Sequence, residues 1–259
     1  MDYGMQIAAM GAMTSMARQD ILTNNLANLN TAGFKPAQAF TMLRDAARVE
    51  DGLSSLPSDK MLERLGGGVH LAPVRFRYQQ GPIERSSNPF DVAIEGDGFF
   101  VVRAGGETAG EELRLSRDGR LTRNDAGELV RVADGLPVLD GAGRTIRIPD
   151  AESIVIDRDG VIRANGEPVG RLELVDVPDR MQLTPEEGGL LRPTAEAWSN
   201  RVEGTGGVRQ FAVEGSAVNE FSALMEMTGA GRSAQANLGM IGYHDQLLNS
   251  AINRFGRLS

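Results

Sequence analysis

Two short segments of this 259-residue sequence have residue types that occur at chemical sites. Gly96-Asp97-Gly98 could begin a dinucleotide-binding fingerprint, but the third glycine is missing. The Phe99 to Val102 run that follows has the pattern of a strand, whereas the phosphate site requires the N-terminus of a helix. Asp157 to Gly160 is similar to part of a calcium loop but lacks a third ligand and the closing glutamate. Both segments are therefore interpreted as turns.

The histidines and carboxylates give no better sign of catalysis. His70 and His244 are the only histidines, and neither has an acidic neighbour at the spacing of a catalytic or zinc site. The sequence contains no cysteine, which excludes disulfides, thiolate metal sites and cysteine nucleophiles. We therefore predict no catalytic residue, no cofactor and no metal site, and we do not expect an enzyme.

Charge is distributed unevenly along the chain. The formal net charge is −8, of which residues 1–35 contribute zero and residues 211–259 contribute −1. An acidic chain without a basic stripe argues against nucleic acid as a partner, because that affinity depends on Lys and Arg. No stretch approaches the roughly 20 apolar residues of a membrane span, and the N-terminus does not have the pattern of a secretory signal.

Both ends of the chain have the periodicity of amphipathic helices. The N-terminal apolar residues recur at spacings of three and four; they are Ile7, Met10, Met13, Ala17, Ile21, Leu22, Leu26 and Leu29. The C-terminal apolar residues are spaced as in a heptad seam; they are Phe221, Leu224, Leu238, Ile241, Leu248, Ile252 and Phe255. Two core helices of one globule would show the same pattern. Polar and small residues within the seam favour a contact among several helices, and Gly229 and Gly231 predict a kink or a closer approach there.

The middle of the chain reads as strands and turns. Short apolar runs at 91–94, 99–102, 113–115, 146–148, 154–156 and 172–175 are separated by Asp-Gly and Asn-Gly pairs, which are typical of tight hairpins. Residues 180–210 have the composition of an irregular return path. The predicted fold class is α+β, with N- and C-terminal helices that pair in a coiled-coil-like domain and a mainly antiparallel, meandering β body between them.

This pattern divides the chain into three parts. Residues 1–40 and 211–259 are predicted to form a terminal helical domain, and residues 81–210 a β-rich outer domain. Residues 41–80 are predicted to be a linker with short connecting elements. The linker region includes a helical piece over 37–49, a glycine- and serine-rich connector over 51–68 and a strand over 69–78.

One motif discriminates between classes of protein. The segment from Asn24 to Lys35, Asn-Asn-Leu-Ala-Asn-Leu-Asn-Thr-Ala-Gly-Phe-Lys, closely resembles the signature of the bacterial flagellar rod and hook protein family. A capped helix end would explain Gly33, but not four asparagines in so short a segment. Further segments resemble the family in the same order, Ser87 to Val102, Leu115 to Val130 and Glu214 to Asn219, although Ala217 replaces the usual Asn.

The resemblance implies a structural subunit of the flagellar basal-body rod, which polymerises helically into the hollow axle between rotor and hook. Its partners would be other copies of itself, other rod and hook family proteins and the flagellar export apparatus. Leu136 to Leu139 and the tail from Asp245 slightly favour the proximal rod, whereas the chain length and Leu65 to Val69 are more like the distal rod. The competing class is a secreted β-rich adhesion module with oligomerising helices.

The residues themselves suggest how such a subunit would assemble. Helical ends that lack charge are expected to order only between neighbouring subunits. Gly33 is expected to adopt a positive φ. The motif and subunit-contact candidates are Asn24, Asn25, Leu26, Ala27, Asn28, Thr31, Gly33, Phe34, Lys35, Val218, Asn219, Phe221, Leu224, Leu238, Ile241, Leu248 and Ile252.

Overall fold

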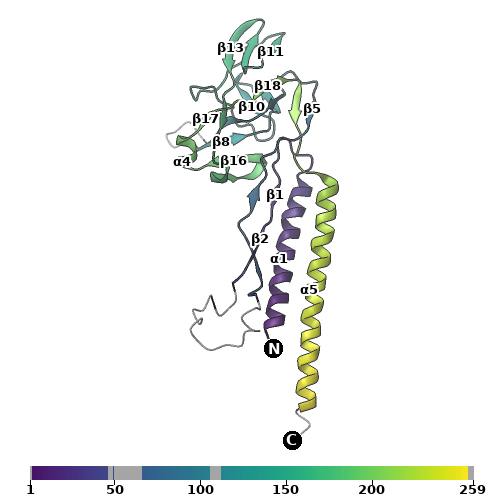
Figure 1. Ribbon diagram of the computed structural model, residues 1–259. Coiled ribbons are helices and arrows are strands. Elements are labelled where there is room, and N and C mark those ends of the chain that lie inside the picture. The colour runs from purple at the N-terminus through teal and green to yellow at the C-terminus, as the bar shows by residue number, and fades with distance from the viewer. Residues whose placement is uncertain (1, 46–48, 50–65, 106–111, 256–259) are drawn as a thin grey trace. The chain divides into compact units, whose positions relative to one another are not determined.

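A computed structural model describes residues 2–45, 49, 66–105 and 112–255 (Figure 1). Most of the predicted connector over 51–68 lies outside the described residues. The chain divides into two compact units. The helical unit comprises Met1–Ala27, Ala37–Arg75 and Asn219–Ser259, and the β unit comprises Asn28–Pro36 and Phe76–Val218.

The helical unit is built on two long helices that lie side by side, α1 (Asp2–Ala27) and α5 (Glu220–Phe255) (Figure 1). They run antiparallel, since the hydroxyl of Ser15 donates to that of Ser233 at 3.1 Å, and Arg18 pairs with Glu226 at 3.3 Å. The two helices predicted at the chain ends are therefore present. Gly229 and Gly231 do not interrupt α5, which continues as one helix through both.

The fully buried positions of α5 are all alanines, Ala223, Ala230 and Ala234. Its buried and half-buried positions alternate at spacings of four and three: Ala223, Met227, Ala230, Ala234, Asn237, Ile241, His244, Leu248 and Ala251. On α1 the fully buried apolar residues are Ala8, Ala12 and Leu22. Because alanines occupy much of this seam, several large apolar side chains of both helices stay exposed to solvent.

A β-hairpin also packs on α1 in the helical unit. Its strands are β2 (Thr41–Leu43) and β3 (Val69–Leu71), with Thr41 opposite Leu71 and Leu43 opposite Val69. Short strands β1 (Ala37–Gln38) and β4 (Arg75–Phe76) flank it. The predicted helix over 37–49 is wrong for residues 37–45, where β1 and β2 form because β4 and β3, distant in sequence, pair with them; residue 49 is helical. The strand predicted over 69–78 is correspondingly split into β3 and β4.

The β unit contains one sheet of six antiparallel strands and several smaller sheets. In spatial order the large sheet contains β15 (Leu183–Pro185), β16 (Leu190–Pro193), β8 (Glu112–Ser116), β7 (Phe99–Ala104), β14 (Leu174–Asp176) and β17 (Val202–Glu203). The smaller sheets are β11 (Ile154–Ile156), β12 (Val161–Ala164) and β13 (Glu167–Arg171); β9 (Leu121–Arg123) with β10 (Leu129–Arg131); β6 (Val92–Glu95) with β18 (Gly207–Gln210); and β5 (Ile83–Arg85) with β19 (Ala212–Glu214).

Strand β7 separates two hydrophobic cores. Phe100 and Val102 belong to one buried cluster, and Phe99 and Val101 belong to the other. Successive side chains of a strand point to opposite faces of the sheet, so this continuous apolar run is buried on both sides. The two cores of the β unit therefore lie on either side of β7, which the sequence predicted as a strand over residues 99–102.

The antiparallel β region is confirmed, but its predicted order is not. The strands do not meander, since β8 lies between β16 and β7. The run at 146–148 is not a strand: of these residues Arg147 alone forms a bridge, with Glu128. The Asn-Gly turn prediction holds at the β12–β13 hairpin, where Asn165 and Gly166 have φ values of 50° and 89°.

Residues 180–210 are more regular than predicted. Besides strands they contain α4 (Ala195–Ser199) and the 3-10 turns Arg180–Gln182 and Glu187–Gly189. Thr194 caps α4 by accepting a hydrogen bond from the backbone of Ala197. Within the described ranges, none of the helices combines the length and apolar character needed to cross a membrane.

Candidate functional site: a buried ion cluster joining three sequence motifs

Two segments far apart in sequence meet in the β unit. The backbone N–H of Gly33 donates to the carbonyl of Glu214 at 2.8 Å, and that of Ala217 donates to the carbonyl of Phe34 at 3.1 Å. Glu214 ends β19, which pairs with β5. The chain that follows α1 and the chain that precedes α5 are therefore hydrogen-bonded to each other inside one unit.

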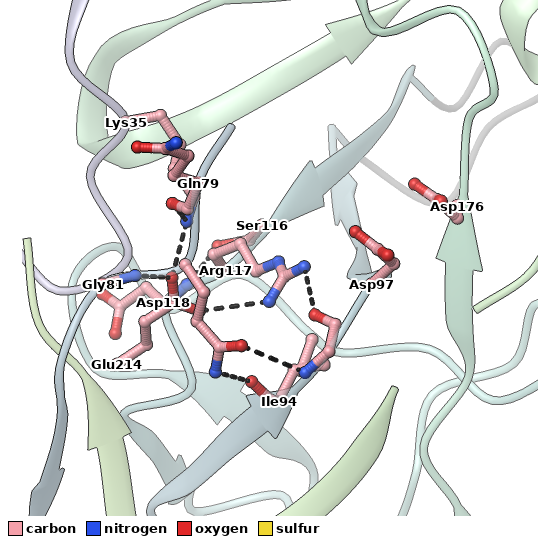
Figure 2. Close-up of polar contacts among 12 residues, drawn as sticks. Lys35, Gln79, Gly81, Ile94, Asp97, Ser116, Arg117, Asp118, Asp176 and Glu214 are labelled. Carbon is pink, nitrogen blue, oxygen red and sulfur yellow. Dashed lines mark hydrogen bonds and ion pairs between the residues drawn. The ribbon is translucent and has the colours of Figure 1, made fainter. Parts of the chain in front are cut away.

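The Glu214 carboxylate is the centre of a buried ion cluster, defined here as Lys35, Arg117 and Glu214 (Figure 2). Oε1 accepts from Nζ of Lys35 at 2.5 Å and from the backbone N–H of Gly81 at 2.9 Å. Oε2 accepts from Nη1 of Arg117 at 3.2 Å. The side chain of Glu214 has no exposure to solvent, so these donors replace the water that a carboxylate requires.

Both cations of the cluster make additional contacts. Lys35 also donates to the carbonyl of Gln79 at 2.7 Å, and Arg117 donates to the carbonyl of Gly96 at 2.8 Å. The guanidinium of Arg117 lies 5.2 Å from the centre of the Phe99 ring. Burial lowers the pKa of Lys35 and of Arg117, and the negative charge of Glu214 opposes that shift. One carboxylate therefore offsets the burial of two positive charges.

Gly33 is required by this packing. Its φ is 67°, which confirms the prediction from sequence. A Cβ added there would lie 2.6 Å from the backbone carbonyl carbon of Arg117. Only a residue without a side chain allows the motif to approach the backbone of Arg117, directly after β8.

We expect Gly33→Ala to destabilise the β unit more than Gly135→Ala. Both glycines have a φ near 70°, so both substitutions carry the left-handed strain of about 1–2 kcal/mol. Only Gly33 also meets backbone, since the space around Gly135 is open. Urea unfolding followed by the fluorescence of Trp198, the only tryptophan, measures the difference. Equal losses in the two variants would contradict the role of close packing at Gly33.

Two asparagines of the motif make hydrogen bonds to the chain that follows α1. In the helical unit, the buried amide of Asn25 donates to the carbonyl of Ala37 at 2.8 Å and accepts from its N–H at 2.9 Å. In the β unit, Asn28 accepts a hydrogen bond from the hydroxyl of Thr31 at 3.0 Å. Both residues fix the path of the chain after α1 ends, so a simple helix cap does not explain them.

The remaining candidates lie in several environments. Asn24 and Ala27 are exposed, whereas Leu26, Phe34 and Val218 are half-buried. Asn219 caps α5 by accepting from the N–H of Ser222 at 3.0 Å. Along α5, Ile241 and Leu248 are half-buried, whereas four candidates are exposed: Phe221 by 78%, Leu224 by 39%, Leu238 by 51% and Ile252 by 68%.

Sequence reasoning did not assign roles to Arg117 and Glu214, although it quoted the segments that contain them. The signal was available in part. Arg117 follows an apolar strand, and Glu214 ends one, so each is a charge beside core residues. Their pairing with Lys35 depends on the tertiary fold, because 97 and 179 residues separate Glu214 from its two partners.

The segment before β6 forms a second polar network. The Asp91 carboxylate accepts from the Ser86 hydroxyl at 2.5 Å and from the Asn88 amide at 2.9 Å. These bonds close a turn at the entry to the buried strand Val92–Glu95. This segment, like the ion cluster, fixes backbone rather than presenting a reactive group.

Tyr78 packs edge-on against Phe99 beside the ion cluster, and burial raises the pKa of Tyr78 to about 12. An unfolded tyrosine ionises near pH 10. The unfolded chain therefore loses this proton first, and the stability of the β unit is expected to fall as pH rises from about 10 to 12. Urea titrations across that range should show a smaller fall for Tyr78→Phe. An identical pH dependence in both proteins would contradict this assignment.

The ion cluster has the character of a structural site. Lys35 and Glu214 are buried, and protein groups satisfy both, so neither is exposed to act on a substrate. The fold and this site define a structural protein, in which one β unit holds together the segments that lead from one long helix and into the other.

Comparisons with known proteins identify the family. Residues 93–164 match the family described as "Flagellar hook protein FlgE/F/G D1 domain", and residues 5–35 match "Flagella basal body rod protein". The chain is 31% identical to the flagellar basal-body rod protein FlgF of Caulobacter vibrioides, over the whole of both chains. It is 29% identical to FlgG of Agrobacterium fabrum, over 93% of this chain and 95% of FlgG. Identity to FlgF of Salmonella typhimurium is 30%, over 93% of each chain.

The chain belongs to the flagellar basal-body rod protein family. It is a structural subunit of the rod in the flagellar basal body, and the adhesion class considered from the sequence is not favoured. Its relatives include both FlgF and FlgG.

Proposed function

We propose that this chain polymerises helically with copies of itself and with other rod and hook proteins, and that α1 and α5 line the inner tube as a coiled-coil-like domain. In this assembly the helical unit forms the inner domain and the β unit the outer domain. The sequence division put residues 1–40 and 211–259 inside, 81–210 outside and 41–80 between them; it differs because residues 28–36 and 211–218 belong to the β unit and residues 37–75 to the helical unit. The flagellar export apparatus delivers the chain. The proximal rod is the position we favour, on the segments Leu136 to Leu139 and Asp245 to Leu258.

The observation that carries this proposal is the exposure of large apolar side chains on the two helices. Phe221 is 78% exposed, Met225 77%, Met13 71%, Tyr243 66% and Leu247 65%. Isolated exposed apolar residues are common on soluble proteins, but contiguous ones mark interaction surfaces. These residues gather on the helices whose ends match the family motif.

The energetics favour a polymer. Burying one such side chain contributes about 1.5–3 kcal/mol, so several together offset the entropy lost when subunits are ordered. Contacts between different surfaces of identical subunits do not close on themselves unless the rotation allows it, and they then extend as a helical filament. The candidates Phe221, Leu224, Leu238 and Ile252 would supply part of this contact surface.

Electron microscopy of hook-basal bodies tests the proposal. A strain that lacks the gene for this protein is compared with its parent and with the same strain complemented by the gene in trans. We expect a missing or shortened rod without a hook, restored by the gene. A shorter stub indicates a proximal position and a longer stub a distal one. Intact hook-basal bodies in the deleted strain would remove the chain from the axle.

A further inference from the structure

Helix α1 has three faces, and the described residues of the chain cover two of them. One face meets α5 through Ser15, Arg18 and Thr23. A second face meets the hairpin, where Met10 approaches Gly68. Residues on one helix face recur every three or four positions. The third face, called here the free face of α1, is exposed and consists of Met13, Met16, Asp20 and Ala27.

Helix α5 also has a face that no described residue covers. Opposite the alanine-rich seam, residues at spacings of three and four are all exposed, and large side chains stand at both ends with small ones between. This free face of α5 consists of Phe221, Met225, Gly229, Arg232, Ala236, Met240, Tyr243 and Leu247.

Each free face carries one ionic side chain. Asp20 lies beside Met16 on α1, and Arg232 lies between Gly229 and Ala236 on α5. Neither forms an ion pair with any described residue. We propose that the free face of α5 docks on the free face of α1 of a second copy, with Arg232 paired to Asp20 of that copy.

The sizes of the neighbouring side chains fit this pairing. When Asp20 is placed against Arg232, Met16, four residues before Asp20, faces either Ala236 or Gly229, depending on the direction of the partner helix. A large side chain then meets a small one in both directions, as interdigitated packing requires. The Asp20–Arg232 pair lies among apolar residues. It selects the register of the two helices, because opposite charges attract only when they are brought opposite each other.

A second copy is the occupant that the charges favour. Arg232 and Asp20 of one chain stand on faces turned away from the seam that joins α1 to α5, so they do not meet each other. The surfaces are different, and therefore each copy offers one to the copy before it and one to the copy after it, as an open helical polymer requires. This inference rests on the proposed polymerisation and specifies its contact.

Cysteine crosslinking tests the contact directly, because the native chain has no cysteine. Hook-basal bodies are isolated from cells whose only copy carries Asp20→Cys and Arg232→Cys, then oxidised and separated without reductant. We expect dimers and a ladder of larger species. Cells that carry the two single variants together should give dimers only, and each single variant alone should stay monomeric. Asp20→Cys with Leu238→Cys is the matched control and should give no ladder, because Leu238 lies on another exposed face of α5 and any contact it makes in the polymer is with a surface other than the free face of α1.

Other crosslinking outcomes would overturn the contact. A monomeric double variant, an intramolecular bond, or dimers from one single variant alone would each contradict it. Leu238→Cys ladders as strong as those of Arg232→Cys would contradict its specificity.

Charge reversal gives a second readout that does not depend on crosslinking. Asp20→Arg and Arg232→Asp should each lower the amount of assembled protein several-fold, and the two together should restore it. If the wild-type chain itself is absent from hook-basal bodies, the proposed polymerisation fails. If the wild type assembles while neither crosslinks nor restoration are seen, only the Asp20–Arg232 contact fails.

Discussion

Glu214→Gln is expected to destabilise the β unit by about 3–5 kcal/mol, because it leaves Lys35 and Arg117 buried without their carboxylate. The side chains of these two residues are 4% and 3% exposed, so water does not replace the lost charge. Trp198 lies in the β unit, and its fluorescence during urea unfolding reports the change.

A matched control separates burial from charge. Glu203 pairs with Arg171 at 3.5 Å, but its side chain is 79% exposed. Glu203→Gln should therefore change the free energy of unfolding by less than about 1 kcal/mol. A double-mutant cycle adds a further test, since Lys35→Met should cost less in the Glu214→Gln background than alone. Equal effects of the two glutamine variants would show that the ion cluster does not hold the β unit together.

Phe221→Asp is expected to abolish rod assembly while leaving the isolated chain as stable as the wild type. Phe221 is 78% exposed, so its loss removes little from the monomer, and surface substitutions usually change stability by about 0.5 kcal/mol or less. In the polymer, an aspartate would place a charge in an apolar contact. Motility of a complemented strain, and the amount of the chain in isolated hook-basal bodies, measure assembly.

Ser222→Asp is the control for this variant. It adds the same charge one residue further along α5, on another exposed face, and it also lies in the first helical turn, where an acidic residue is favourable. We expect it to assemble normally. Normal assembly of Phe221→Asp would show that Phe221 does not contribute to the proposed contact between subunits. A large loss of monomer stability would show instead that Phe221 packs within its own chain.

The candidate site was only partly visible in the sequence. The motif from Asn24 to Lys35 was recognised, and a positive φ at Gly33 was predicted correctly, because few functions other than a left-handed turn require glycine after a helix. The role of Lys35 was not predicted. Its carboxylate partner comes from the other end of the chain, and a single sequence contains no sign of contacts over that distance.

Local patterns determined much of the fold by themselves. The three- and four-residue spacing of apolar side chains specified both long helices, since helix geometry depends on neighbours within two turns. The Asn165-Gly166 pair specified its hairpin in the same local way, because the two residues that form the turn are the ones that must adopt a positive φ. Family membership followed from a local motif as well.

Only the tertiary structure decided what each local pattern contacts. Apolar spacing did not indicate that α5 would turn its alanines toward α1 and leave Phe221 exposed, since a helix in a polymer has apolar faces for its own chain and for others. Residues 41–43 became a strand because β3 lay within reach to pair with them, and residues 37–38 because β4 did. Lys35, Arg117 and Glu214 became one cluster because a buried charge is strongly destabilising unless an opposite charge is close to it in space. The free energy of that pairing does not depend on how far apart the residues are in sequence.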